Sequence, residues 1–137
     1  MTSEIREVSV LLIAGSPSAP SRSAVLLDAV AARLEVRKVP VDRLAIRELA
    51  AHALLLGEAS HPTVQKAAEQ VQRADVVVIA TPVYKAAYSG VLKVFLDLLP
   101  QSALKVITPR SGDELQLKVG SDVVALVKST EVSIAKL

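Results

Sequence analysis

The sequence predicts an α/β protein with a parallel sheet, because strongly apolar runs of strand length alternate with segments of helical periodicity. The two apolar runs are VSVLLIA at residues 8–14 and DVVVIA at residues 75–80. Continuous apolar runs of this length are typical of strands that are buried on both faces, as the strands of a parallel sheet are. Helical periodicity is clearest at residues 23–34 and 62–73.

The first helix follows the first strand after a polar loop. Its apolar side chains recur at helical spacing between residues 23 and 34, and Ser21 or Ser23 is suited to capping its N-terminus. Residues 36–41 form a shorter and more charged apolar segment, which suits an edge strand. The stretch from there to His61 is expected to be irregular.

The second half of the α/β pattern is punctuated by proline. The helix at residues 62–73 begins with a proline, which is favoured at the first helical position. The strand at residues 75–80 leads into a predicted loop, TPVY, at residues 81–84. A last helix is expected from Ser89 or Gly90 to Leu99, where Pro100 stops it.

The pattern changes after Pro100. Three short β-type runs, separated by polar turns, lie at residues 106–108, 123–127 and 132–134. Residues 111–114 have capping-box spacing for one helical turn. The chain therefore divides into an α/β region at residues 1–100 and a short β segment at residues 101–137.

The composition excludes several classes of function. With 137 residues, of which 51% are hydrophobic, the chain can bury a core of its own. Its net charge of +2 is spread among interspersed acids and bases, so nucleic acid is not an expected partner. The absence of cysteine excludes a disulfide framework and a thiolate metal site. No apolar stretch approaches the roughly 18 residues that span a bilayer. We expect a soluble, cytoplasmic protein with no membrane partner and no metal.

The loop after the first strand, GSPSAPSRS at residues 15–23, contains the parts of an anion site. Gly15 permits a tight turn, the start of the helix supplies N–H groups with partial positive charge, and Arg22 adds a full charge. The loop has neither the G-x-G-x-x-G pattern of dinucleotide-binding folds nor a Walker A pattern. The same residues also fit an ordinary Ser/Pro-rich turn with a helix cap, and their spacing leaves both interpretations open.

The longer loop region after the second buried strand, TPVYKAAYSG at residues 81–90, contains both tyrosines of the chain, Tyr84 and Tyr88. Backbone N–H groups at such a turn can reach the polar edge of a flat cofactor, and Tyr84 can cover its apolar face. Alternatively, both tyrosines pack beneath the following helix. In a doubly wound sheet, ligands bind beyond the carboxyl ends of the strands where the winding reverses. Both loops are therefore expected to meet at one crevice.

Two segments in this order, LIAGSPSAPSRSAVLL and VVVIATPVYKAAYSGVLKVFLDLLP, closely resemble the NADPH-dependent FMN reductases of the sulfonate-assimilation type. The resemblance covers residues 8 to about 100 and implies a truncated flavodoxin-like parallel sheet with strand order 2-1-3. It also implies FMN as the cofactor and NADPH or NADH as the electron donor. Because the cofactor itself carries such chemistry, no catalytic acid or base is assigned. His52 and His61 lie outside both motifs, and surface or helix-capping roles are expected for them.

The same resemblance assigns binding residues. Those expected to line the FMN phosphate pocket are Ser16, Ser18, Ser21, Arg22 and Ser23. Those expected to meet the flavin ring are Pro82, Val83 and Tyr84. Residues 85–99 would help form the family's subunit interface, so the resemblance implies a homo-oligomer.

The last segment, VITPRSGDELQLKVGSDVVALVKSTEVSIAKL, resembles instead the C-terminal half of a molybdate-binding Mop domain of the molbindin type. This resemblance is assigned to residues 104–137. That resemblance implies an oxyanion site whose residues are Lys128, Ser129 and Thr130. The first half of such a domain is absent, and the three residues also fit a turn with a capping hydroxyl. Three functions stay open: a flavin reductase, an oxyanion-binding module, and a fusion that keeps the fold without either activity.

A parallel core that stops at its third strand has an unpaired edge. Open edges of this kind promote association between chains. Either the C-terminal β segment or a second subunit is expected to cover it.

Overall fold

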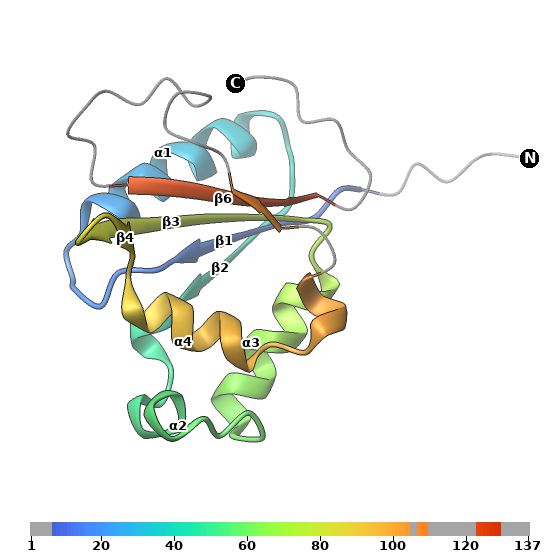
Figure 1. Ribbon diagram of the computed structural model, residues 1–137. Helices are drawn as coiled ribbons and strands as arrows, with labels where there is room; N and C mark the ends of the chain where they lie inside the picture. Colours follow the sequence, from blue (N-terminus) through green and yellow to red (C-terminus); the bar gives the residue numbers. More distant parts are fainter. Residues whose placement is uncertain (1–6, 105–106, 110–122, 130–137) are drawn as a thin grey trace, which may run out of the picture.

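The structure is a computed structural model that describes residues 7–104, 107–109 and 123–129. Its sheet has the order β2-β1-β3-β6-β5 (Figure 1). Strands β1 (Val10–Ala14), β2 (Val41–Ala45) and β3 (Val76–Tyr84) are mutually parallel. Strands β6 (Val123–Ser129) and β5 (Ile107–Pro109) extend the sheet in antiparallel pairings. The predicted α/β class and the 2-1-3 parallel core are confirmed.

The two apolar runs pair side by side and in register. Val10 lies opposite Val76, and Ala14 lies opposite Ala80. Because the strands are parallel, both run toward the same edge of the sheet, where β1 ends at Ala14 and β3 continues past Ala80 to Tyr84. The segments after Ala14 and Ala80 are thereby brought together.

The outer edge of β3 is covered within the chain. Strand β6 pairs with β3 along its length, with Ser129 opposite Val76 and Val123 opposite Pro82. Of the two expected ways of covering this edge, the described strands show the intrachain one. Strands β5 and β6 thus belong to the same sheet as the parallel core.

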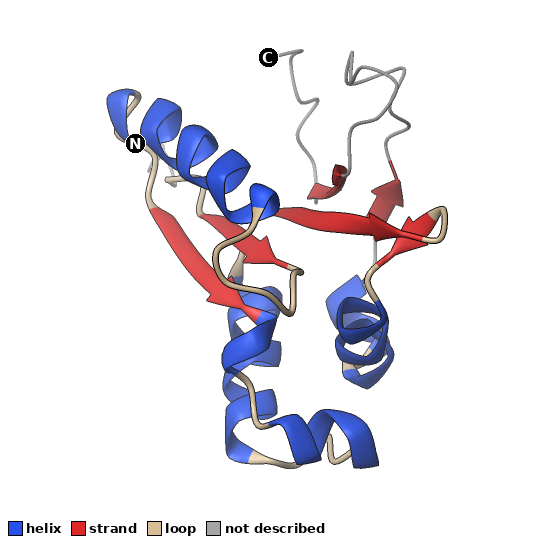
Figure 2. Cartoon of the chain, turned by 90° about the vertical axis from the view of Figure 1, so that its left-hand side faces the viewer, coloured by secondary structure: helices blue, strands red, loops and turns tan. Residues whose placement is uncertain are grey.

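Helices lie on both faces of the parallel core, as Figure 1 and Figure 2 both show. One face is covered by α1 (Arg22–Val36). The other is covered by α3 (Pro62–Arg73) and α4 (Gly90–Leu98), with the short α2 (Ala51–Leu56) beyond them. No helix among the described residues is long and apolar enough to cross a membrane.

Alternating side chains of β1 supply the two halves of the core. Leu11 and Ile13 are buried in one cluster together with Phe95 of α4. Val10 and Leu12 are buried in the other cluster against Leu27 of α1. Both faces of the strand are therefore buried away from water, which explains why its sequence is continuously apolar.

The predicted edge strand at residues 36–41 is wrong in position. Helix α1 continues to Val36, and the strand begins only at Val41. A tight turn separates them, in which Lys38 has a φ of 58° and Val39 donates a hydrogen bond to the carbonyl of Leu34. Val36, at the end of the helix, is 84% exposed, so its apolar side chain does not mark a buried strand position.

The stretch before His61, which was expected to be irregular, contains helical structure. A 3₁₀ turn spans Ile46–Glu48 and is followed by α2. Ile46, Ala53 and Leu54 are buried against the core. These few apolar contacts hold a helix that is too short to be recognised from periodicity.

The predicted loop at residues 81–84 is part of β3. The strand continues to Tyr84 and turns into a hairpin with β4 (Ala87–Tyr88). The two turn residues between the strands, Lys85 and Ala86, have φ values of 51° and 63°. Two-residue hairpin turns with positive φ at both positions are favoured by Asn-Gly.

The double substitution K85N/A86G is expected to raise the free energy of unfolding by about 1 kcal/mol, because side chains other than Asn and Gly are strained in this conformation. Urea denaturation followed by circular dichroism measures the change. Lys66→Asn in the exposed part of α3 is the control, and it should lower stability slightly because Asn is a weaker helix former than Lys. A hairpin variant that is less stable than the parent would contradict the assignment of strain.

The C-terminal predictions are described in part. The β-type runs expected at residues 106–108 and 123–127 correspond to β5 and β6. The expected run at 132–134 and the helical turn at 111–114 lie outside the described residues.

Candidate functional site

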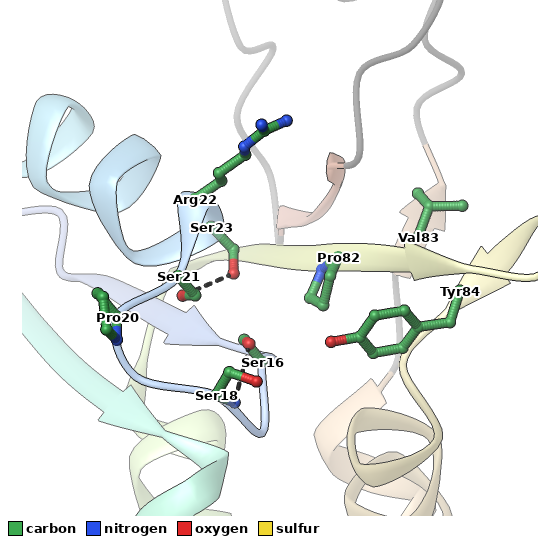
Figure 3. A pocket seen from close by; sticks show the side chains of 9 residues that line it. All are labelled: Ser16, Ser18, Pro20, Ser21, Arg22, Ser23, Pro82, Val83 and Tyr84. Atoms are coloured by element: carbon green, nitrogen blue, oxygen red, sulfur yellow. Dashed lines mark hydrogen bonds between the residues drawn. The ribbon is translucent and has the colours of Figure 1, made fainter.

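A pocket of about 310 Å³ lies where the segment after β1 meets the C-terminal end of β3 (Figure 3). This volume is at the small end of the range of about 300–1,000 Å³ that is typical of ligand sites. The lining residues are Ser16, Ser18, Pro20, Ser21, Arg22, Ser23, Pro82, Val83 and Tyr84. All eight residues that were expected to bind the cofactor are among them, and Pro20 is the addition.

Hydroxyl groups and a helix start form one side of the pocket. The buried Ser16 accepts a hydrogen bond at Oγ from the N–H of Ser18, at 3.1 Å. Ser21 is the N-cap of α1, and its Oγ accepts from the N–H of Ala24 at 3.1 Å. The Oγ atoms of Ser21 and Ser23 are 3.2 Å apart. The first turn of a helix carries a partial positive charge, so this side combines hydroxyl donors with the electrostatics of an anion site.

Arg22 lines the pocket but differs from the other residues in orientation. Its guanidinium extends away from the hydroxyls of Ser16 and Ser18 (Figure 3). On this side of the pocket, the helix start and the serine hydroxyls therefore lie together, apart from the guanidinium of Arg22. The full positive charge of Arg22 lies at its outer rim.

The end of β3 forms the opposite side. Tyr84 is 47% exposed, and Figure 3 shows its ring reaching toward residues 15–23, the serine loop. Tyr88, by contrast, is half-buried and packs against the core cluster that contains Phe95. The two open interpretations of the tyrosines thus apply to one residue each: Tyr84 faces the pocket, whereas Tyr88 packs inward.

Two buried hydroxyls next to the pocket belong to Thr81 and Ser89. The sequence predicted only that Ser89 stands at a helix start, and it predicted no role for Thr81. Thr81 and Ser89 are 0% and 1% exposed, and Ser89 is the N-cap of α4. The hydroxyl of Ser89 donates to the carbonyl of Gly15, which lies 74 residues earlier in the chain. A serine or threonine beside a proline or at a helix start is too common to indicate such a contact.

The histidines lie apart from the pocket. His61 is the N-cap of α3, where its Nδ1 accepts from the N–H of Thr63 at 3.2 Å, and the expected capping role is confirmed. The pKa of Lys93 is raised because it donates a hydrogen bond to Asp97, one turn along the exposed side of α4. That pair is not part of the pocket lining.

The residues expected to bind an oxyanion are not brought to this pocket. Lys128 and Ser129 belong to β6 and lie opposite Val77 and Val76, at the start of β3. The pocket is built on the other end of that strand. Thr130 lies outside the described residues.

Known proteins share this sequence pattern. The family described as NADPH-dependent FMN reductase matches residues 8–131. The chain is 45% identical over 102 residues to an FMN reductase (NADPH) of Escherichia coli (strain K12). The alignment covers 73% of this chain and 53% of the relative. It is 32% identical over 121 residues to an NADH-dependent FMN reductase of Pseudomonas putida. This alignment covers 82% of this chain and 63% of the relative.

Solved structures share the fold. The apo form of an NADH:FMN oxidoreductase matches with a TM-score of 0.66 and 39% identity, over 71% of this chain and 52% of that chain. An oxidoreductase from Corynebacterium diphtheriae matches with a TM-score of 0.60 and 25% identity, over 72% of this chain and 58% of that chain. The chain spans about half the length of the first curated relatives, 53% and 52%.

The family match extends to residue 131 and so includes most of the segment that resembles half of a Mop domain. The comparisons give no support to a Mop domain there. They agree with the parallel core and with the two loop motifs that meet at its carboxyl edge. The chain belongs to the NADPH-dependent FMN reductase family.

Proposed function

We propose that this chain binds FMN in the pocket between the serine loop and the end of β3, and that it supports reduction of the flavin by NADPH or NADH. One observation carries the proposal. Two motifs that are about 60 residues apart along the chain supply all the lining residues of one pocket at the carboxyl edge of a parallel sheet. The pocket occurs in a member of a family of FMN reductases.

The residues present fit the phosphate end of FMN. A phosphate needs donors and positive potential, and the start of α1 supplies both together with the hydroxyls of Ser16, Ser18 and Ser23. Arg22, at the rim, adds long-range attraction for an anion. Ser21 caps α1, since its Oγ accepts from the N–H of Ala24, and this keeps the first turn of the helix in place.

The residues at the end of β3 fit the ring. Pro82 and Val83 offer half-buried apolar surface, and the exposed face of Tyr84 offers a flat aromatic partner. Bound flavin supplies the hydride-accepting chemistry, and the part of the protein is to orient the two reacting rings. No side chain of this pocket is required to transfer a proton.

Three further expectations remain proposals. Residues 1–100 act as the flavin-binding region, and residues 101–137 act as a β segment that completes the sheet. The protein works in the cytoplasm as a homo-oligomer to whose interface residues 85–99 contribute. On α4, the apolar side chains of Val91, Val94 and Leu98 pack against the core but stay partly exposed, and their exposed parts support that last proposal.

Oxyanion binding has weaker support than flavin binding. It depends on the resemblance of residues 104–137, and Lys128 and Ser129 are separated from the pocket by the length of β3. We therefore propose the flavin function in preference to a molybdate site at Lys128, Ser129 and Thr130.

Titration of FMN with the purified protein tests the proposal. We expect quenching of flavin fluorescence at micromolar protein, followed by bleaching of the flavin absorbance when NADPH or NADH is added without oxygen. Parallel titrations with the two nucleotides establish which donor is used. Absence of quenching would overturn flavin binding. Quenching without bleaching would overturn the reductase activity and leave a flavin-binding protein that keeps the fold alone.

A further inference from the structure

Behind the pocket, three segments meet around the hydroxyl of one buried serine. The Oγ of Ser89 donates a hydrogen bond to the carbonyl of Gly15, the residue that follows β1. The same oxygen accepts from the N–H of Leu92 in the first turn of α4, at 3.3 Å. One side chain thereby joins the start of the serine loop to the start of a helix far along the chain.

A threonine closes this contact on the side of β3. The Oγ1 of Thr81 accepts from the N–H of Ser89 at 3.1 Å and donates to the carbonyl of Pro82 at 3.1 Å. In addition, the N–H of Gly15 donates to the carbonyl of Ala80 at 2.8 Å. The end of β1, residues 80–82 of β3 and the start of α4 are therefore linked by a continuous set of hydrogen bonds.

The atoms around Gly15 at this junction are closely packed. A Cβ atom added to Gly15 would lie 3.1 Å from Cδ2 of Leu92 and 3.2 Å from Cβ of Thr81. Leu92 is 0% exposed, so water cannot easily replace a lost hydroxyl here. Removing one partner of a buried hydrogen bond leaves the other partner unsatisfied, which is more costly than losing an exposed bond.

The junction lies one residue from the pocket on each side. Gly15 directly precedes Ser16, which lines the phosphate side, and Thr81 directly precedes Pro82, which lines the ring side. We propose that Ser89 and Thr81 are positioning residues that hold the serine loop and the end of β3 at the separation FMN requires. The proposal rests on the proposed function, since it concerns the same pocket.

A role limited to capping α4 would have different consequences. Loss of a cap weakens a helix and lowers global stability without a specific effect on a distant loop. Loss of the junction loosens the serine loop itself, in the protein without ligand. The backbone of residues 15–18 is therefore the place where the two roles can be told apart.

Hydrogen–deuterium exchange of the full chain without ligand measures this directly. In Ser89→Ala and in Thr81→Val, which nearly conserves volume, we expect the amides of Gly15, Ser16 and Ser18 to exchange about tenfold faster than in the parent. Thr81→Ser, which keeps the hydroxyl, should restore most of the protection. His61→Ala, which removes the cap of α3 instead, should leave residues 15–18 unchanged. Equal exchange of these residues in the parent and both hydroxyl-deleted variants would overturn the proposal.

Flavin binding supplies the second readout. Ser89→Ala is expected to weaken FMN binding about tenfold and to weaken riboflavin binding much less, because riboflavin lacks the phosphate that the serine loop would hold. An unchanged ratio of FMN to riboflavin affinity in the variant would overturn the positioning role while leaving FMN binding intact. If the parent bound no FMN, the proposed function would fail, whereas faster loop exchange in the variants would still show that the junction holds the loop.

Discussion

Ser21→Asp is expected to abolish tight FMN binding while leaving the fold intact. Asp caps a helix as well as Ser does, and its charge interacts favourably with the start of α1, so stability should be unchanged or slightly higher. The same carboxylate would stand in the pocket beside the position proposed for the phosphate, which carries a charge of about −1.5 to −2 at neutral pH. Two like charges about 4 Å apart repel by about 4 kcal/mol at an effective dielectric constant of about 20.

That repulsion corresponds to a loss of FMN affinity of at least about 100-fold, which fluorescence titration measures. Riboflavin provides the matched ligand, since without a phosphate its affinity should change little. Ser21→Asn provides the matched variant, because it keeps the cap and adds no charge. Equal affinity of Ser21→Asp and the parent for FMN would place the phosphate elsewhere.

Phe95→Ala is expected to lower the free energy of unfolding by about 3–5 kcal/mol. Phe95 is the only phenylalanine of the chain and is 0% exposed, in the cluster between the sheet and the helices α3 and α4. The chain has little other aromatic volume with which to fill the resulting cavity. Because domains are typically stable by about 5–15 kcal/mol, this single change should remove a large share of the total.

Chemical denaturation followed by circular dichroism measures the loss. Leu55→Ala is the control, since Leu55 is 85% exposed on α2 and its truncation should change stability by less than about 0.5 kcal/mol. A loss below about 1 kcal/mol for Phe95→Ala would mean that the helices do not pack on the sheet as described.

The parallel core and the pocket could be predicted because each depends on strong local patterns. Burial on both faces makes β1 continuously apolar, and that signature is hard to confuse with an exposed element. Once two such strands are parallel neighbours, topology alone brings Ser16 and Pro82 to one edge. Resemblance to flavin reductases then indicated which residues after β1 and at the end of β3 line the pocket.

The rest depends on contacts between distant residues. The end of α1 and the extension of β3 to Tyr84 are decided by packing and pairing, which override local preference. The antiparallel direction of β6 is not encoded in its own composition. Likewise, the bond between Ser89 and Gly15 spans 74 residues, and no periodic pattern marks either partner.

The hairpin that follows Pro82 determines when conformational entropy is lost. Tyr84 is paired with Ala87 through the backbone, so it belongs to a two-stranded ribbon with a tight turn instead of a free loop. Ordering a loop upon association with a ligand subtracts from affinity each time binding occurs. Here the backbone that carries the aromatic ring is ordered once, when the chain folds, and ligand binding does not have to order it again.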